Sequence, residues 1–345
     1  MKAAILEEIE HLVVKELPDP QLEEGSVIIK VKVCSICGSD LRIYHHGHPR
    51  VKLPHILGHE IAGEIESVSE GKGSHKVNDR IALTPRITCG KCYYCREGHP
   101  IYCLNSQSFG YQLPGGYAEY VLVPRRGAEL GLVNRIPDTI SYEEATLSET
   151  LACCLRAQKE SRVSSGNTVV IIGGGPVGII HCRLAKANQA RMVIIVERDS
   201  KRLSQVSLSA IDKIVESTTS EVEEEVLDLT KGVGADVVIV ACSSASAQEQ
   251  ALSLAAKGGR INFFGGLPAH QSRIAIDSNL IHYREISIQG SHGSTPDDNK
   301  EALDMLAQRL LDVGDLITHT FPLEAIEKAF QFADTREGMH TSIVL

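Results

Sequence analysis

The 345-residue chain contains no apolar run long enough to cross a membrane. Its longest uncharged apolar stretch, residues 168–182, includes three consecutive glycines and a proline and stops at Arg183. A spanning helix needs about 20 apolar residues. The first residues, 1–8, lack the apolar core of a secretory signal peptide. We therefore expect a cytoplasmic protein.

The chain also lacks tryptophan and an excess of basic residues, and its formal net charge is −9. This acidic balance opposes nucleic-acid phosphates as the main partner. The fractions of hydrophobic (43%) and charged (23%) residues are ordinary, which excludes a disordered, collagen-like or low-complexity protein. Single cores rarely grow beyond about 250–300 residues, so the length predicts two domains. We expect a small-molecule substrate, no nucleic acid and no membrane.

The two parts of the chain differ in their patterns. Residues 1–151 alternate polar and apolar positions in short runs between Gly and Pro, which indicates an antiparallel or barrel-like all-β unit. Its clearest predicted strands are 27–33, 63–68 and 117–123.

From residue 154 to 289, apolar strands alternate with helices, which predicts a doubly wound parallel sheet and hence an α/β protein. The predicted strands are 169–172, 192–196, 237–241 and 260–264, and the predicted helices are 177–188, 200–209 and 247–256. After them come helices at 299–311 and 323–333 and a strand at 342–345, which we expect to fold back onto the first domain.

A glycine-rich turn follows the first strand of this second part. Gly173, Gly175 and Gly178 fit G-x-G-x-x-G at the start of a helix, where glycine allows a tight turn and close approach of a pyrophosphate. Such turns also occur without a ligand, but the strand before it and the helix after it favour dinucleotide binding. The candidate cofactor-binding residues are Gly173, Gly175, Pro176, Val177, Gly178, Glu197, Arg198 and Arg202.

Glu197 ends the next predicted strand. A carboxylate there would accept hydrogen bonds from the ribose hydroxyls and repel a 2′-phosphate, which favours NAD over NADP. Arg198 follows directly and weakens that preference.

Ten cysteines are unusual in a reducing compartment, where clusters are more often metal sites than disulfides. Four of them form the pattern C-x2-C-x2-C-x7-C between residues 89 and 103. Four thiolates at this spacing can bind one zinc tetrahedrally at about 2.3 Å, leaving no open coordination position. An iron–sulfur cluster and four free thiols are the alternatives. A zinc ribbon for nucleic acid is disfavoured because the loop carries few basic residues. The predicted structural-zinc ligands are Cys89, Cys92, Cys95 and Cys103.

A second group offers the ligand types of a catalytic zinc with one open position. Its parts are Cys37, followed by Ser39 and Asp40, and His59, followed by Glu60. Asp40 would accept the imidazole N–H of a ligating His59 and fix its tautomer.

Together, these motifs resemble the zinc-containing medium-chain dehydrogenases/reductases, in the branch of sorbitol and threonine dehydrogenases. Further matching stretches are Gly115-Gly116-Tyr117-Ala118-Glu119-Tyr120 and Gly258-Gly259-Arg260. The resemblance implies a GroES-like catalytic domain over 1–153 and 291–345, with a structural zinc lobe at about 86–106. It also implies a Rossmann NAD-binding domain over 154–290 and an active site in the cleft between them.

The resemblance further implies residue roles. Cys37 and His59 match catalytic zinc ligands, Glu149 lies in the segment that supplies a third, and Glu60 matches a residue beside the metal. Ser39, Asp40 and Glu60 are the candidate catalytic residues. We expect two zinc ions per chain, one catalytic and one structural.

Two positions depart from the family pattern. Thr150 replaces a proline, and Arg42 replaces a histidine that passes the proton to solvent. Arginine cannot shuttle protons near neutral pH, so the relay is expected to use Ser39, or His45 or His46.

The expected function is transfer of a hydride between NAD(H) and a secondary alcohol, most simply a polyol or sugar alcohol. Alternatives are a phosphorylated sugar-alcohol dehydrogenase, an L-threonine 3-dehydrogenase, and a non-catalytic NAD-binding zinc protein. The acid-free basic stretch 42–52 would hold a phosphate or carboxylate if it faces the cleft; otherwise it is a solvated loop. We expect a homodimer or homotetramer, with 285–289 as the candidate edge strand.

Overall fold

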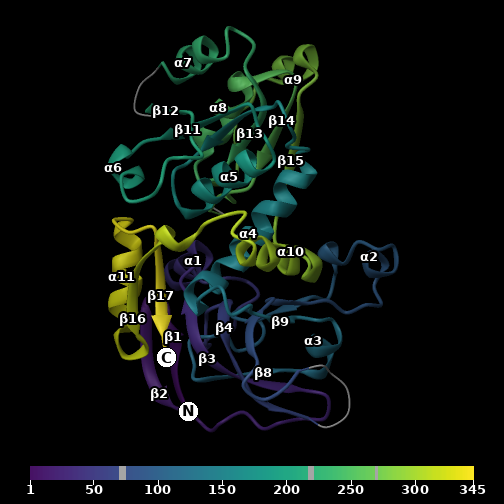
Figure 1. Cartoon of the computed structure of the whole chain (residues 1–345), viewed down its shortest axis with the longest axis vertical. Helices are drawn as coiled ribbons and strands as arrows, with labels where there is room; N and C mark the ends of the chain where they lie inside the picture. Colours follow the sequence, from purple (N-terminus) through teal and green to yellow (C-terminus); the bar gives the residue numbers. More distant parts are fainter. Residues whose placement is uncertain (70–74, 217–220, 269–270) are drawn as a thin grey trace. The chain divides into compact units, whose positions relative to one another are not determined.

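The computed structural model describes residues 1–69, 75–216, 221–268 and 271–345. The chain divides into two units, one of Met1–Ala152 with Ser294–Leu345 and one of Cys153–Gly293 (Figure 1). The sequence analysis predicts the two boundaries between these units after residues 153 and 290. None of the helices in the described part of the chain has both the length and the apolar character that a bilayer crossing requires.

The first unit is built on a seven-stranded sheet in the order β16-β17-β3-β4-β5-β9, with β8 also paired to β3. The pairings are antiparallel except β16 with β17. The strands are β3 (Val27–Ser35), β4 (Glu60–Val68), β5 (Arg80–Leu83), β8 (Tyr120–Val123), β9 (Val133–Arg135), β16 (Ile317–Pro322) and β17 (His340–Val344).

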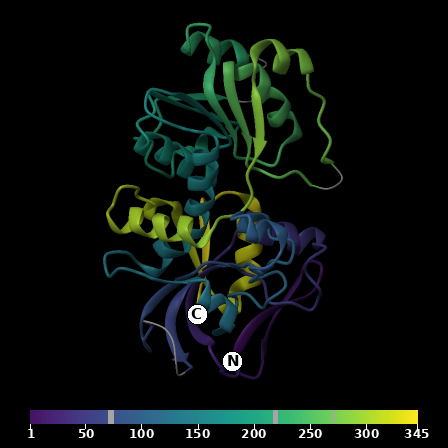
Figure 2. The same ribbon diagram turned by 90° about the vertical axis from the view of Figure 1, so that its right-hand side faces the viewer.

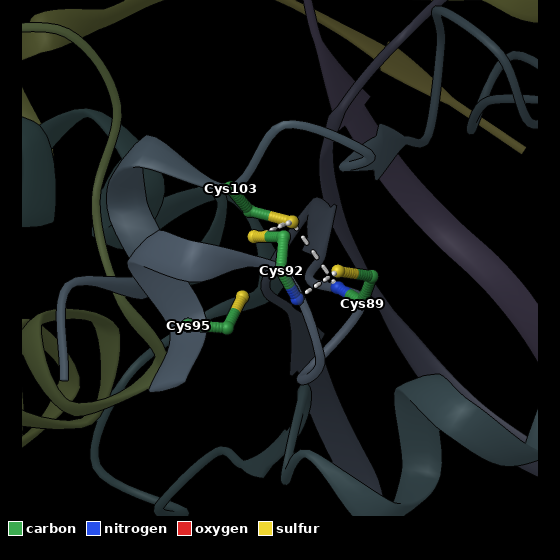
Figure 3. A group of neighbouring side chains, drawn as sticks. All are labelled: Cys89, Cys92, Cys95 and Cys103. Atoms are coloured by element: carbon green, nitrogen blue, oxygen red, sulfur yellow. Dashed lines mark hydrogen bonds between the residues drawn. The ribbon is translucent and has the colours of Figure 1, made fainter. Parts of the chain in front are cut away.

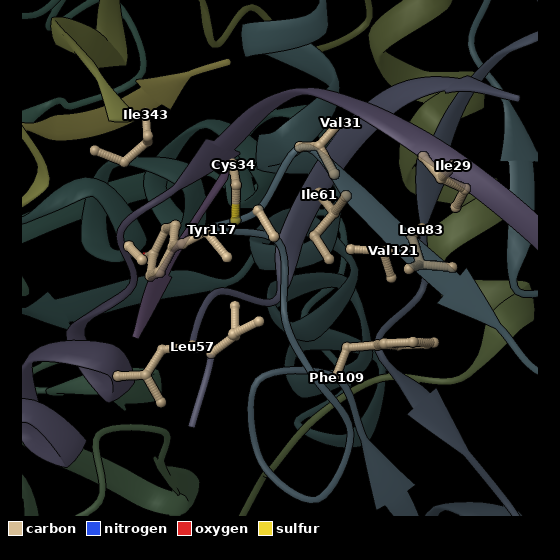
Figure 4. Close-up of a cluster of buried hydrophobic side chains, with 14 of the residues drawn as sticks. Ile29, Val31, Cys34, Leu57, Ile61, Leu83, Phe109, Tyr117, Val121 and Ile343 are labelled. Carbon is tan, nitrogen blue, oxygen red and sulfur yellow. The ribbon is translucent and has the colours of Figure 1, made fainter. Parts of the chain in front are cut away.

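The end of the chain belongs to this first sheet, as the sequence predicts. In β17, Ile343 lies opposite Cys34 of β3. Both side chains are fully buried, in the same core as Tyr117 (Figure 4). Phe330, from the preceding helix α11 (Ile326–Thr335), packs against Tyr117 with ring centres 5.8 Å apart. Residues separated by most of the sequence therefore share one core.

Smaller elements complete the first unit. They are β1 (Lys2–Glu8), β2 (His11–Glu16), α1 (Gly38–His46), β6 (Arg86–Ile87), α2 (Tyr93–Arg96), β7 (Gln107–Ser108), α3 (Arg125–Glu129) and α10 (Pro296–Ala307). Helix α4 (Tyr142–Glu160) begins in the first unit and ends in the second.

The second unit is built on a six-stranded parallel sheet in the order β12-β11-β10-β13-β14-β15 (Figure 2). This strand order is that of a dinucleotide-binding sheet. The chain adds strands outward from β10 to one edge and then from β13 to the other, and ligands of such sheets bind at this switch point, at the carboxyl ends of the strands. The strands are β10 (Thr168–Ile172), β11 (Met192–Glu197), β12 (Lys213–Glu216), β13 (Ala235–Val240), β14 (Ala255–Phe263) and β15 (Ser287–Gly290).

Helices connect and pack on these strands. Helix α5 contacts β10 and β11, and α8 contacts β13 and β14. The sheet residues Val169–Ile171 and Val237–Val240 are fully buried, which explains their uninterrupted apolar sequence. The helices are α5 (Pro176–Ala187), α6 (Ser200–Leu203), α7 (Val222–Leu229), α8 (Ala245–Leu254) and α9 (Ser278–Arg284).

One predicted helix is much shorter than expected. The sequence predicts a helix over 200–209, but α6 ends at Leu203. The hydroxyl of Ser204 donates to the carbonyl of Lys201 at 2.7 Å, and that of Ser207 donates to the hydroxyl of Ser209 at 3.1 Å. Serine side chains that bond locally in this way compete with helical hydrogen bonds.

Candidate metal and dinucleotide sites

The four cysteines of the first-unit lobe converge. Ligand atoms of Cys89, Cys92, Cys95 and Cys103 all lie within 4.8 Å of one another (Figure 3). Gly90 and Gly98 allow the chain to wrap around them with positive φ angles of 72° and 79°.

Backbone amides prepare this lobe for negative charge. The Cys89 sulfur accepts the N–H of Cys92 at 3.4 Å, and the Cys103 sulfur accepts the N–H of Cys89 at 3.3 Å. Amide donors from Lys91 and Cys92 lower the pKa of Cys89 to about 6. Four sulfurs around one point fit a closed tetrahedral zinc, which requires thiolates.

The second predicted group also assembles within the first unit. Candidate ligand atoms of Cys37, His59 and Glu60 lie within 4.8 Å of one another. Cys37 is the N-terminal cap of α1, and Glu60 is the first residue of β4, directly after His59. The start of one helix and the start of one strand therefore position all three side chains.

Asp40 orients the imidazole and its surroundings. Its Oδ1 lies 3.4 Å from His59 Nδ1, and its Oδ2 accepts the Cys37 N–H and the Tyr117 hydroxyl, each at 3.1 Å. Burial opposes a charge on His59, but the Asp40 carboxylate and the Cys37 thiol together raise its pKa well above the usual value. Ser39 Oγ lies 3.5 Å from His59 Nε2. With Asp40 at Nδ1, Nε2 is the imidazole nitrogen that would bind a metal.

Glu60 accepts a hydrogen bond at one carboxylate oxygen and lies beside a histidine at the other. Oε1 accepts the Thr150 hydroxyl at 2.8 Å, and Oε2 lies 3.1 Å from Nε2 of His340. Glu60 is 1% exposed. Burial alone would raise its pKa, but His340, together with His59 and the Thr150 hydroxyl, outweighs that effect and lowers it. Glu60 is therefore an anion inside the protein.

The sequence did not predict that Thr150 and His340 would contact Glu60. Thr150 appears in the sequence only as a departure from proline, and His340 lies in the last strand, far from Glu60 in sequence. No spacing rule links them, because the contact exists only once β17 pairs with β3.

Glu149 is the predicted ligand that stands apart. It lies half-buried in α4, next to Thr150, and does not belong to the converging group of Cys37, His59 and Glu60. Its role as a ligand stays a prediction.

The donor set fits a zinc ion. Thiolate, imidazole and carboxylate are zinc ligands. Within the described residues, Asp40 Oδ1, His59 Nδ1, Glu60 Oε2 and His340 Nε2 are buried without a well-aligned hydrogen bond. Buried polar groups are normally paired, so this cluster is incompletely satisfied by protein atoms alone.

In the second unit, the glycine-rich turn has the shape that a pyrophosphate needs. Gly173 has a φ of 110°, and a Cβ added at Gly178 would collide with the Gly173 carbonyl oxygen. Pro176 starts α5, and Val177 follows it in the first turn of that helix. The turn leads directly from β10 into the helix N-terminus.

Two charged residues border this turn. Glu197, the last residue of β11, accepts the N–H of Gly174 and also that of Arg198 at 2.7 Å. The Arg202 guanidinium lies 3.4 Å from where a Cβ of Gly175 would be. An acid and a base therefore both border the cofactor turn.

The basic stretch 42–52 divides into separate environments. The two ring nitrogens of His45 lie 2.6 Å from carboxylates of Glu10 and Asp334. Because both nitrogens are engaged in this way, His45 is a poor candidate for the proton relay. His46 and Lys52 are exposed.

Known proteins match the chain over nearly its whole length. Residues 23–133 match the family model of the alcohol dehydrogenase GroES-like domain, and residues 176–308 match that of the zinc-binding dehydrogenase. A sorbitol dehydrogenase of Halalkalibacterium halodurans is 31% identical over 95% of this chain and 94% of its own.

Other relatives carry different names. An L-threonine 3-dehydrogenase of Bacillus subtilis is 32% identical over 96% of this chain and 94% of its own. A D-arabitol-phosphate dehydrogenase of Enterococcus avium is 31% identical over 91% and 88%. The solved structure of a zinc-binding dehydrogenase of Sinorhizobium meliloti bound to NADP superposes with a TM-score of 0.90, at 28% identity, over 100% of this chain and 99% of its own.

Proposed function

The chain belongs to the zinc-binding alcohol dehydrogenase family, and we propose that it oxidises a secondary alcohol of a polyol or sugar alcohol with NAD. The observation that carries this proposal is the convergence of Cys37, His59 and Glu60 beside Ser39. The family is that of zinc-dependent oxidoreductases with a nicotinamide cofactor.

The residues of the site have distinct roles in this proposal. When bound, zinc supplies Lewis-acid polarisation of the alcohol oxygen, and the nicotinamide accepts a hydride. Cys37 and His59 would hold the metal, with Glu60 or Glu149 as the carboxylate. Asp40 keeps the imidazole of His59 in one orientation.

Ser39 is the proposed first acceptor of the alcohol proton. Its hydroxyl lies 3.5 Å from His59 Nε2, the nitrogen that would hold the metal, and it is therefore within reach of that site. Arg42 stays protonated near neutral pH and does not relay the proton. Ser39→Ala is expected to lower kcat by about 10²–10⁴-fold, the usual contribution of a positioned acid or base.

The preference for NAD over NADP is proposed from Glu197. Its carboxylate borders the cofactor turn, whereas Arg198 and Arg202 favour a phosphate. Comparison of kcat/KM for the two cofactors tests this proposal. Glu197→Gln should shift the ratio toward NADP, and an unchanged ratio would contradict the role of Glu197.

A homodimer or homotetramer joined through β15, at the edge of the parallel sheet, and a cytoplasmic location are also proposed. None of the ten cysteines, all of which lie in the described part of the chain, forms a disulfide, which is consistent with a reducing compartment. Light scattering with and without a charged substitution at Ile288 of β15 would test the assembly.

The alternatives are separated by one substrate panel with zinc analysis. Two zinc ions per chain and turnover of polyols support the proposal. Preferred turnover of L-threonine would make the chain an L-threonine 3-dehydrogenase. Zinc only in the four-cysteine lobe, with no turnover of any alcohol, would indicate a non-catalytic NAD-binding zinc protein.

A further inference from the structure

Two basic side chains gather on one aromatic ring in the first unit. The guanidinium carbon of Arg50 lies 5.0 Å from the centre of the Tyr111 ring. The imidazole of His48 meets the same ring edge-on, with ring centres 5.3 Å apart. The backbone N–H of Arg50 donates to Nδ1 of His48 at 3.1 Å, which fixes the two residues relative to each other.

This cluster lies beside the predicted catalytic metal. The ring of Tyr111 also faces His59, with ring centres 6.0 Å apart. One aromatic ring therefore separates the basic cluster from a metal ligand. If Cys37 and His59 hold the reacting end of a linear polyol, the far end of that substrate is the part that this cluster would meet.

Arg50 has no acidic partner among the residues that the structure describes. Within the part of the chain that the structure describes, no carboxylate forms an ion pair with Arg50, whereas Arg125, Arg135 and Arg309 each pair with one. Arg50 is half-buried against Tyr111, which limits the freedom of its guanidinium.

Arg50 is the charged group that the geometry places on the Tyr111 ring. Burial lowers the pKa of the neighbouring His48, and the nearby charges of Arg50 and Arg42 lower it further. A stacked guanidinium presents a rigid fork of N–H donors that matches phosphate or carboxylate oxygens.

We propose that Arg50, with His48, binds an anionic group at the far end of the alcohol substrate. The group is a phosphate or a carboxylate, which both offer oxygens to the guanidinium fork. This inference rests on the proposed function and narrows it from polyols in general to polyols with a terminal oxyanion. Tyr111 acts as the platform that holds the guanidinium.

The test compares sorbitol, sorbitol 6-phosphate and gluconate as substrates of the zinc-loaded enzyme. Wild type should show at least tenfold higher kcat/KM for one of the two anions than for sorbitol, and the better anion identifies the group. Arg50→Gln should reduce that selectivity at least tenfold, which corresponds to about 1.4 kcal/mol. The loss should appear mainly in KM, because Arg50 does not touch the reacting atoms.

Lys52→Gln is the matched control, because it removes the same charge from an exposed position of the same stretch. It should leave the selectivity unchanged. Arg50→Lys should restore only part of it, since lysine keeps the charge but loses the planar fork. Thermal unfolding of each variant would show that it is folded.

Calorimetry with sorbitol 6-phosphate and gluconate gives a readout that does not depend on turnover. Arg50→Gln should weaken binding of the preferred anion at least tenfold, while Lys52→Gln should not. Sorbitol preferred over both anions, or equal losses for neutral and anionic substrates in Arg50→Gln, would overturn the inference. Absence of turnover with every alcohol would refute the proposed function instead, and the calorimetric comparison would still decide the inference.

Discussion

The hydroxyl of Thr150 donates to Oε1 of Glu60 at 2.8 Å, and thereby ties helix α4 to the first residue of β4. Both residues are buried, and Glu60 sits in the group that would hold the metal. Thr150, which stands where the family pattern has proline, thus supplies a hydrogen bond to a buried carboxylate.

Loss of this hydrogen bond is expected to destabilise the protein. Thr150→Val keeps the shape of the side chain but leaves one oxygen of a buried carboxylate without its donor. Hydrogen bonds to charged groups contribute about 1.5–3 kcal/mol, so urea unfolding should show a decrease of that size. Thr150→Ser retains the hydroxyl and should recover most of the stability. A larger loss in Thr150→Ser than in Thr150→Val would show that the methyl group matters more than the hydrogen bond.

The interaction of His45 with Glu10 and Asp334 predicts a pH-dependent contribution to stability. Burial opposes protonation, but the two carboxylates raise the pKa of His45 overall. The stabilisation is therefore fully present below the unfolded pKa of about 6.5 and is lost as pH rises through the higher folded value. His45→Gln should destabilise the protein more at pH 6 than at pH 9.

Each of these ion pairs is partly exposed, so the total effect should be below about 2 kcal/mol. The matched control removes both carboxylates: in a Glu10→Gln, Asp334→Asn background, His45→Gln should show no such dependence on pH. A loss that is the same at both pH values would mean that His45 stabilises by packing rather than by charge.

The four-cysteine lobe predicts a defined change in metal content. Cys92→Ser removes one of four converging sulfurs, so zinc per chain should fall from two to one by elemental analysis. The melting temperature should also fall, because binding free energy at a structural site is folding free energy. Cys153→Ser, at a half-buried cysteine outside both predicted metal groups, should retain two zinc ions.

The glycine-rich turn predicts loss of cofactor binding from a single methyl group. In Gly178→Ala, the new Cβ would meet the carbonyl oxygen of Gly173 and push α5 away from the turn. NADH affinity, measured by its fluorescence, should fall at least tenfold. Gly290→Ala is the control, because a Cβ at that position would lie 3.8 Å from the carbonyl oxygen of Phe263, an ordinary contact distance. Normal NADH binding by Gly178→Ala would contradict the role of this turn.

Local patterns predicted most of the architecture. The apolar run Val169–Ile172 and the glycines after it identify a buried parallel strand and its turn, because both depend on neighbouring residues only. The spacing of Cys89, Cys92, Cys95 and Cys103 identifies the lobe for the same reason.

Contacts between distant segments were beyond the reach of the sequence. His340 approaches Glu60 through the pairing of β17 with β3, and no residue near either one indicates it. The length of α6 depends on how the hydroxyls of Ser204 and Ser207 bond locally, which helix periodicity does not reveal.

The contact between Glu60 and His340 has a consequence for folding. The two residues are 280 positions apart in the sequence and meet through the pairing of β17 with β3. Contacts of such high sequence separation form slowly, because a long stretch of chain must close before they are made. The buried carboxylate of Glu60 therefore acquires its imidazole neighbour only when the two separate segments of the first unit have come together.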